Sequence, residues 1–249
     1  MQSLKISEEK GCYRFDSFSN FPIVAVFSDR TFDMRFAEDT LSGSNDRQAF
    51  CEMLKIPGRD LVCLEQIHGA NIVLVTSEMK GRGATHRQDA LAKADGAIVR
   101  ERCIPTGVQT ADCASVFLYD PKNETVGIAH VGWRGLYAGI TEKMVAAFTN
   151  NFKCRPKDLL VGLGPMIRKC CYEVGEDVAS FFGSFVIKRR GKIYLDLTNA
   201  IINALHAKGV KKTNIEDMGF CTSCHNELFY SHRREGNLAG RTLSVIMLA

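Results

Sequence analysis

The chain has 249 residues, of which 45% are hydrophobic and 24% charged, a profile typical of a globular protein with a sizeable core. Its 32 Lys and Arg residues exceed its 28 Asp and Glu residues by only four, and the excess is spread along the chain. The composition therefore argues against a protein that binds nucleic acid or a membrane surface. No apolar run approaches the roughly 18 residues of a membrane span, and the sequence does not begin like a secretory signal.

Ten cysteines accompany only six histidines. We expect a cytoplasmic protein, in which thiols stay reduced and serve as core residues, metal ligands or nucleophiles. The sequence shows no internal repeat, and its six prolines do not cluster into a linker. We therefore predict a single domain over residues 1–249, with a monomer as the favoured state.

The predicted elements alternate between strands and helices without a strict order. In chain order they are a strand at 23–27, a helix at 46–54 capped by Ser44 or Asn45, strands at 61–64, 72–75, 97–99, 114–119 and 125–129, a helix at 136–152, a strand at 159–163, helices at 176–182 and 198–208, and a strand at 243–248. Because several strands follow one another directly, an α+β fold with a mixed sheet is expected rather than a doubly wound fold.

One predicted hairpin bears on function. The strands flank Pro121-Lys-Asn-Glu124, and a turn that closes symmetrically about its centre places His130 opposite Ser115. Cys113, two residues before Ser115, then projects to the same face as His130. Such diagonal neighbours lie roughly 7–8 Å apart, close enough to share a metal ion, whereas a slip of one residue would separate them.

Three motifs are far less generic than the rest of the chain: Gln66-Ile-His-Gly69, Thr110-Ala-Asp-Cys113 and His130-Val-Gly-Trp-Arg-Gly135. Further segments accompany them: Ala94-Asp-Gly-Ala97, Gly162-Leu-Gly-Pro165, Cys171-Tyr-Glu-Val-Gly175, Cys221-Thr222, Phe229-Tyr-Ser-His-Arg-Arg234 and Gly240-Arg241. In this order, over about residues 20 to 249, the chain resembles the bacterial laccase-domain family, formerly called polyphenol oxidases and now linked to purine nucleoside phosphorylase activity.

The resemblance implies that His68, Cys113 and His130 are metal ligands and catalytic residues. It implies an α+β fold in which mixed β-sheets form a sandwich-like core flanked by helices. It also implies zinc-dependent phosphorolysis of adenosine, inosine, guanosine or methylthioadenosine, with phosphate as co-substrate, and deamination of adenosine. Segment 27–36 departs from the Gly-Gly-x-Ser pattern of many relatives, so the resemblance assigns no substrate contact there.

Two imidazoles and one thiolate suit Zn²⁺, and three protein ligands leave a fourth position open, as in catalytic zinc sites. The alternative is that His68 is a turn residue and Cys113 a buried core thiol. A multicopper oxidase needs many imidazoles, often in H-x-H pairs, and the six histidines form no such pair. A copper-binding polyphenol oxidase, as the family's former name says, is a further alternative, and copper can replace zinc in such a site.

The segment Gly132-Trp-Arg-Gly135 follows a strand and opens the next helix. Free backbone N–H groups at a helix start, with a nearby guanidinium, favour an anion site, so Arg134 and Gly135 are expected to hold phosphate or orient a ribose. The alternative is a tight connection with Arg134 in solvent and Trp133 in the core. Asp112 should point away from Cys113, to the opposite sheet face, if the strand is regular there.

Two other interpretations stay open. Cys113 as nucleophile and His130 as base would make a cysteine hydrolase. The run Cys221-Thr-Ser-Cys224-His225 has the C-x-x-C-H pattern of c-type haem attachment, which requires export; a second small metal or redox site, or a non-enzymatic sensor, would use the same two thiols. Cys170 and Cys171 are adjacent, which disfavours a mutual bridge, so buried thiols are expected.

Overall fold

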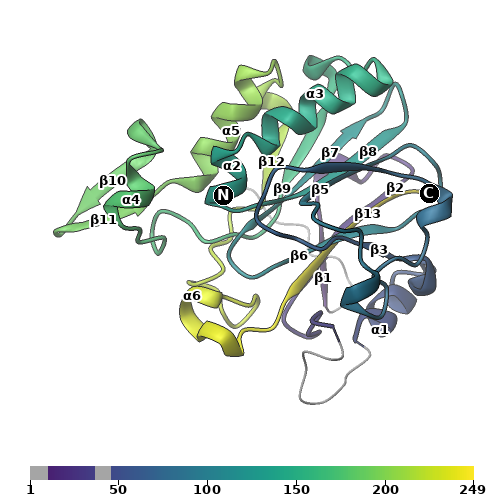
Figure 1. Ribbon diagram of the computed structural model, residues 1–249, viewed down its shortest axis with the longest axis horizontal. Helices are drawn as coiled ribbons and strands as arrows, with labels where there is room; N and C mark the ends of the chain where they lie inside the picture. Colours follow the sequence, from purple (N-terminus) through teal and green to yellow (C-terminus); the bar gives the residue numbers. More distant parts are fainter. Residues whose placement is uncertain (1–10, 37–45) are drawn as a thin grey trace.

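Two β-sheets packed face to face form the centre of the structure, a computed structural model that describes residues 11–36 and 46–249 (Figure 1). The strands are β1 (Cys12–Arg14), β2 (Ile23–Ser28), β3 (Val62–Cys63), β4 (Ile72–Val75), β5 (Gly96–Val99), β6 (Thr106–Thr110), β7 (Ala114–Asp120), β8 (Thr125–Val131), β9 (Leu160–Leu163), β10 (Val186–Arg189), β11 (Lys192–Leu195), β12 (Ile215–Asp217) and β13 (Thr242–Leu248). The α-helices are α1 (Asp46–Met53), α2 (Trp133–Tyr137), α3 (Ile140–Phe152), α4 (Glu176–Ala179), α5 (Leu197–Ala207) and α6 (His232–Glu235).

The strand order explains how distant segments meet. One sheet runs β1-β2-β13-β6-β3, the other runs β12-β9-β7-β8-β5-β4, and β10 pairs with β11 separately. Strands β4 and β5 are parallel, whereas β7 and β8 form an antiparallel hairpin. In the five-stranded sheet, β3 is parallel to β6 whereas β13 is antiparallel to it, so both sheets are mixed, as expected from the sequence.

Side chains of β7 alternate between two apolar environments. Phe117 and Tyr119 pack toward the five-stranded sheet, whereas Val116 and Leu118 pack toward the helices on the other side. This alternation is the period of two that a strand imposes on its side chains. Because both faces of β7 are buried, the six-stranded sheet lies between a second sheet and a helical layer.

Helices cover the outer faces of both sheets. Helices α3 and α5 lie over the six-stranded sheet, and α3 contributes Met144 and Phe148 to the core there (Figure 1). Helix α1 covers the five-stranded sheet, where Phe50 packs with Val245. The layers are helix, sheet, sheet and helix, which confirms the predicted α+β fold with a sandwich-like core.

The predicted hairpin register is confirmed, because Ser115 pairs with His130 across β7 and β8. The helix predicted at 136–152 is wrong in one respect: it is two helices, α2 and α3, separated at Gly139, whose φ of +81° ends the first one. The helix predicted at 176–182 is shorter and ends at Ala179. The proposed caps Ser44 and Asn45 lie outside the described residues.

Five strands were not predicted: β1, β6, β10, β11 and β12. The most consequential is β6, which joins β13 to β3 and carries the polar residues Thr106, Gln109 and Thr110. No helix in the described part of the chain is long and apolar enough to cross a membrane. The single-domain organisation of residues 1–249 stays a prediction.

Candidate functional site

His68 lies in the loop between β3 and β4, in a left-handed backbone conformation with φ of +60°. A non-glycine residue adopts this conformation only where its surroundings hold it there. Three consecutive backbone N–H groups, those of Ile67, His68 and Gly69, donate to the carboxylate of Asp95 at 2.7–3.2 Å. Asp95 therefore fixes the loop that carries the His68 imidazole.

Asp95 also orients His130, which lies near the end of β8. The pairing of Gly96 with Ala129 continues by one residue, so that Asp95 faces His130 and the His130 N–H donates to the Asp95 carbonyl at 2.7 Å. The Asp95 carboxylate lies 2.8 Å from His130 Nδ1. Burial would raise the pKa of this carboxyl, but hydrogen bonds from His130 and from the backbone of Gly69 and Ile67 lower it. With Nδ1 engaged, Nε2 of His130 is left to face the site.

Cys113 immediately precedes β7, on backbone that is not regular strand. Asp112 has a φ of +92°, and its carboxylate accepts hydrogen bonds from the Thr222 hydroxyl at 2.6 Å, the Ser231 hydroxyl at 2.7 Å and the Arg233 N–H at 2.6 Å. The expectation that Asp112 points to the opposite sheet face required a regular strand there; because the backbone is not regular strand, the condition is not met, and Asp112 lines the same pocket as Cys113. Its three donors hold the turn that presents the Cys113 thiol.

The structure brings His68, Cys113 and His130 together. One nitrogen of each imidazole and the Cys113 sulfur lie within 4.8 Å of one another, and the two rings are nearly perpendicular, with centroids 4.7 Å apart. Gly132 leaves room for them, since a Cβ at that position would lie 2.9 Å from the Cys113 sulfur. His68 is exposed, Cys113 half-buried and His130 buried, so the cluster opens to solvent on one side.

The three side chains influence one another electrostatically. Burial would raise the pKa of the Cys113 thiol, but the charge of His130 and hydrogen bonds from both histidines lower it to about 6. Burial would lower the pKa of His130, but the Cys113 thiolate and the Asp95 carboxylate raise it to about 9. Without a bound cation, these opposite shifts favour a thiolate on Cys113 beside a protonated imidazole on His130.

The donor set fits a zinc ion. Tetrahedral zinc bound to imidazole nitrogens and a thiolate sulfur requires donor atoms about 3.3–3.6 Å apart, and the cluster is already drawn together to within 4.8 Å. Asp95 supplies the carboxylate that commonly supports a metal-binding histidine. Three donors leave one side open, which is the pattern of catalytic rather than structural zinc sites.

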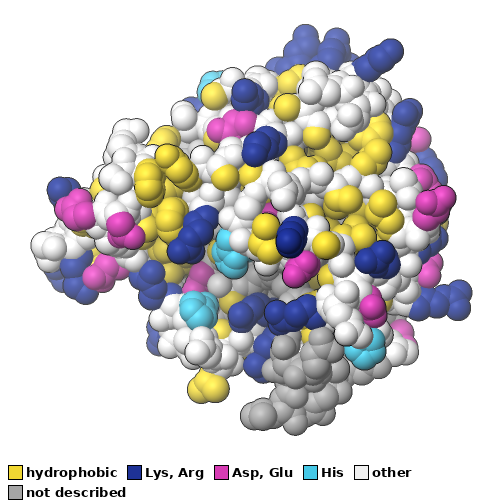
Figure 2. All heavy atoms as spheres, viewed as in Figure 1, with side chains coloured by type: hydrophobic (Ala, Val, Ile, Leu, Met, Phe, Trp, Pro, Cys, Tyr) yellow, Lys and Arg dark blue, Asp and Glu magenta, His cyan; other side chains and the backbone are white. Residues whose placement is uncertain are grey.

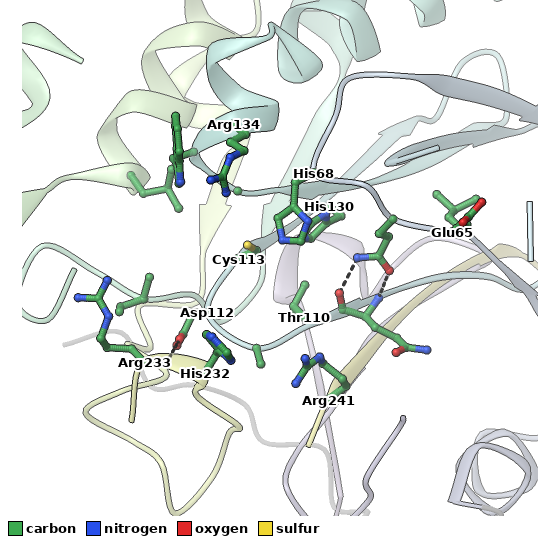
Figure 3. Close-up of a pocket in the computed structure, with 18 of the residues that line it drawn as sticks. Glu65, His68, Thr110, Asp112, Cys113, His130, Arg134, His232, Arg233 and Arg241 are labelled. Carbon is green, nitrogen blue, oxygen red and sulfur yellow. Dashed lines mark hydrogen bonds between the residues drawn. The ribbon is translucent and has the colours of Figure 1, made fainter. Parts of the chain in front are cut away.

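The cluster lies in a cavity of about 470 Å³, within the range of small-molecule sites. Figure 2 shows this face hollowed near its centre, with Lys, Arg and His side chains around the hollow. In Figure 3, Arg134 lies on one side of the cluster and Arg241 on the other, while His232 and Arg233 come from α6. The cavity therefore places cationic groups around the three candidate ligands, which favours an anionic ligand.

Arg134 lines the cavity as part of helix α2, with its guanidinium over the Trp133 ring at 4.5 Å. Trp133 is half-buried and also lines the cavity, so it is not fully buried in the hydrophobic core. Gly135 is buried and does not line the cavity; a Cβ there would lie 2.8 Å from the Gly69 carbonyl oxygen. The structure thus gives Gly135 a packing role, because only glycine lets α2 approach the His68 loop so closely.

The sequence did not predict the roles of several residues that form the site. In the sequence, Asp95 stands out only as part of one motif, and Arg241 only as the end of another. Tyr172 and Gln66 line the cavity, and Gln66 is held by two hydrogen bonds to the backbone of Gln109, at 2.7 and 2.8 Å. The motifs carried the signal for these residues, but their roles required the strand pairing.

Comparison with known proteins agrees with the fold and the motifs. A family profile described as multi-copper polyphenol oxidoreductase laccase matches residues 26–249. The protein named purine nucleoside phosphorylase YlmD from Geobacillus stearothermophilus is 33% identical over 229 residues, which covers 88% of this chain and 84% of that protein. A protein named adenosine deaminase RL5, from an unknown prokaryotic organism, is 28% identical over 218 residues, covering 84% and 83% respectively.

Solved structures give the same result. The crystal structure of YlmD from Geobacillus stearothermophilus superposes with a TM-score of 0.90 at 30% identity and covers 97% of each chain. The crystal structure of the Bacillus licheniformis hypothetical protein YfiH has a TM-score of 0.90 at 27% identity and covers 97% of this chain and 98% of that one. This chain therefore belongs to the multi-copper polyphenol oxidoreductase laccase family, in which relatives similar to it are named purine nucleoside phosphorylases.

Proposed function

We propose that this chain is a zinc-dependent purine nucleoside phosphorylase that acts on adenosine, inosine, guanosine and methylthioadenosine and also deaminates adenosine. The observation that carries the proposal is the cluster of His68, Cys113 and His130 on the wall of a cation-rich cavity. The names of the relatives supply the substrate class. Phosphorolysis would convert the nucleoside and phosphate into the free base and a pentose 1-phosphate.

In this proposal His68, Cys113 and His130 hold the zinc ion and are the catalytic residues. Bound zinc would supply a Lewis acid at the reacting centre. Asp95 keeps a proton on Nδ1 of His130, so that Nε2 offers its lone pair toward the site. The open side of the cluster faces the cavity, where substrate would approach.

The cavity walls match the two parts of the proposed substrates. Arg134 and Arg241 flank the cluster on opposite sides and would hold phosphate or orient the ribose (Figure 3). Tyr172 offers an aromatic ring against which a purine can pack, whereas the Trp133 ring already lies against the Arg134 guanidinium. Asp112 is already occupied by three donors, so its proposed role is to position Cys113 rather than to transfer protons.

The donor set argues against the multicopper centre of the family's description. Within residues 11–36 and 46–249, two clusters of His, Cys, Asp or Glu have the geometry to hold a metal, and one of them contains histidine. That cluster offers two imidazoles, whereas a multicopper oxidase uses many. We therefore propose a mononuclear site in which copper could replace zinc without making the protein a multicopper oxidase.

A cysteine hydrolase is a second candidate, because Asp95, His130 and Cys113 follow one another like an orienting acid, a base and a nucleophile. The Asp95 carboxylate lies 2.8 Å from His130 Nδ1, and Cys113 interacts with the other side of the buried imidazole. The same geometry serves either a metal ligand or a nucleophile. Thiol reactivity separates the two candidates.

Zinc-loaded protein incubated with adenosine and phosphate is expected to release adenine in proportion to phosphate, and to form inosine without phosphate. The Cys113→Ser variant should lose at least about 100-fold in both rates, since removal of one catalytic interaction already has effects of that size. Product separation by liquid chromatography measures both activities. Cys103→Ser, which replaces another free thiol, is the matched control and should keep full activity. Absence of any purine product from the wild type would refute the proposal.

Alkylation by iodoacetamide distinguishes zinc ligand from nucleophile. If Cys113 binds zinc, peptide mass spectrometry should find it unmodified in zinc-loaded protein and modified after chelation, because a bound thiolate resists alkylation. Exposed Cys103 should react equally in both samples and serves as an internal control. Immediate modification of Cys113 in the zinc-loaded protein would favour the hydrolase instead.

Asp95→Asn is expected to lower zinc affinity by about 10–100-fold, because His130 loses the negative charge that orients it and raises its basicity. Competition with a chromophoric chelator measures the affinity, and circular dichroism checks that the fold is kept. Glu65→Gln is the matched control, since the Glu65 carboxylate also lines the cavity but accepts its hydrogen bond from the Lys93 N–H rather than from a candidate ligand. Equal zinc affinity in both variants would contradict the role given to Asp95.

Arg134→Ala is expected to raise the KM for phosphate by about tenfold or more, because a hydrogen bond to a charged group contributes roughly 1.5–3 kcal/mol. Steady-state rates at varied phosphate measure this. Arg100→Ala is the control, because Arg100 is also exposed and also stacks on a ring, that of Phe152, but does not line the cavity. An unchanged KM for phosphate in Arg134→Ala would show that the arginine does not bind the anion.

A further inference from the structure

Four cysteine thiols form a second cluster outside the catalytic pocket. The sulfurs of Cys170, Cys171, Cys221 and Cys224 all lie within 4.8 Å of one another, and each of the four is a free thiol. The Cys224 sulfur lies 3.6 Å from that of Cys170 and 3.4 Å from that of Cys171. The expectation that Cys170 and Cys171 are buried core thiols is wrong, because Cys170 is exposed and Cys171 half-buried.

These separations match a tetrahedral metal site. Four sulfurs bound to one zinc ion at about 2.3 Å lie about 3.8 Å from one another. A disulfide requires a single pair at about 2.05 Å, with the other two thiols left aside. Here Cys224 has two sulfur neighbours at nearly equal distance, so the geometry favours no one pair.

The fold brings the two pairs together for a reason that lies in the sheet. Strands β9 and β12 are parallel neighbours, so the loops that follow them leave the same edge of the sheet. The first loop carries Cys170 and Cys171, and the second carries Cys221 and Cys224. A bridge between Met166 and Cys221 then aligns the two loops beyond the strands.

Side-chain contacts hold the loops in this arrangement. Arg168 donates to the Phe220 carbonyl at 2.8 Å and also pairs with Asp217. In the C-x-x-C loop, the N–H groups of Cys224 and His225 both donate to the Cys221 carbonyl, at 3.1 and 2.9 Å. The chain therefore folds back within four residues, which points both thiols of the motif toward the other pair.

The surroundings are basic. A zinc ion with four thiolates carries two negative charges, which need compensation. Three arginines donate to backbone carbonyls of the ligand-bearing loops: Arg189 to Cys170 at 3.1 Å, Arg233 to Cys171 at 3.4 Å, and Arg234 to Ser223 at 3.1 Å. Their charges lie where an anionic tetrathiolate centre requires them.

We propose that Cys170, Cys171, Cys221 and Cys224 bind a structural zinc ion, separate from the cluster of His68, Cys113 and His130. Thiolates select soft and borderline cations such as zinc over magnesium or calcium. Four protein ligands leave no open coordination position, so this centre is structural and takes no part in substrate chemistry. Binding releases the thiol protons to solvent, which makes the affinity fall at low pH.

The zinc ion clamps one wall of the catalytic cavity. Tyr172, which lines the cavity, directly follows Cys171, and Arg233 reaches from the cavity to the Cys171 and Glu173 carbonyls. Thr222, inside the C-x-x-C motif, donates to Asp112 at 2.6 Å. The two loops thus connect the thiol cluster to both sides of the Cys113 turn.

Zinc content per chain tests the proposal. Protein is produced with zinc under reducing conditions and without chelator, and its zinc content is measured by inductively coupled plasma mass spectrometry. The wild type is expected to hold two zinc ions per chain. Cys224→Ser and Cys170→Ser should each lose one, Cys113→Ser should lose the other, and Cys103→Ser should keep both.

Cobalt provides a readout that does not depend on variants that fail to fold. Titration of metal-depleted wild-type protein with Co²⁺ should produce thiolate-to-cobalt charge-transfer absorption of the strength that four thiolates give, which a centre with one thiolate cannot produce. Cys113→Ser should leave this absorption nearly unchanged, whereas Cys224→Ser should reduce it sharply. None of these readouts uses nucleoside turnover, so they stand apart from the proposed activity.

Four results would overturn the proposal. The first is a wild type whose zinc is lost completely in Cys113→Ser, and the second is a Cys224→Ser variant that folds and keeps the wild-type zinc content. The third is a disulfide among the four thiols in protein kept under reducing conditions, and the fourth is iron in place of zinc at this centre.

Discussion

The buried carboxylate of Asp95 is the constraint on which the candidate site depends. A fully buried carboxylate is costly unless hydrogen-bond donors surround it, and four groups meet this one: three backbone N–H groups of residues 67–69 and the imidazole of His130. The donors come from two segments that are far apart in sequence. The pairing of β5 with β4 on one side and with β8 on the other brings them together around Asp95, so the pairings that satisfy the charge also set the distance between the two histidines.

Two residues of the site have a positive φ angle, and hydrogen bonds to a carboxylate stabilise each of these backbone conformations. His68 has a φ of +60° and Asp112 a φ of +92°, conformations that cost a non-glycine residue roughly 1–3 kcal/mol each. Asp95 holds the first through the loop N–H groups, and Asp112 holds itself through Thr222, Ser231 and Arg233. The strain lies beside the candidate ligands, where regular strand geometry would point the side chains elsewhere.

The parts of this arrangement that follow local rules could be predicted from the sequence. The β7–β8 hairpin has good turn residues and two-sided apolar alternation, so its register, and with it the approach of Cys113 to His130, follows from the chain alone. The fold class follows from the order of apolar runs. Strand β6 escaped prediction because its polar residues Thr106 and Gln109 lack that alternation, although Thr106 is fully buried against its neighbours.

The parts that depend on contacts between distant segments could not be predicted in this way. From the sequence, Asp95 is indistinguishable from a turn residue, and its role depends on the pairing of β5 with β8. Arg241 enters the cavity only because β13 lies between β2 and β6. The four-thiol cluster is of the same kind. Neither the adjacent pair Cys170-Cys171 nor the C-x-x-C motif alone indicates a metal site. The parallel pairing of β9 with β12 brings the two together.

Asp112 links the four-thiol cluster structurally to the cluster of His68, Cys113 and His130. Its carboxylate accepts the hydroxyl of Thr222, which lies inside the C-x-x-C motif, and its backbone leads directly to Cys113. Any displacement of the loop that carries Cys221 and Cys224 therefore changes the turn that presents the Cys113 thiol. A metal ion that ties this loop to Cys170 and Cys171 would restrict such displacement without touching the substrate. Stability at one cluster and geometry at the other are in this way linked through a single side chain.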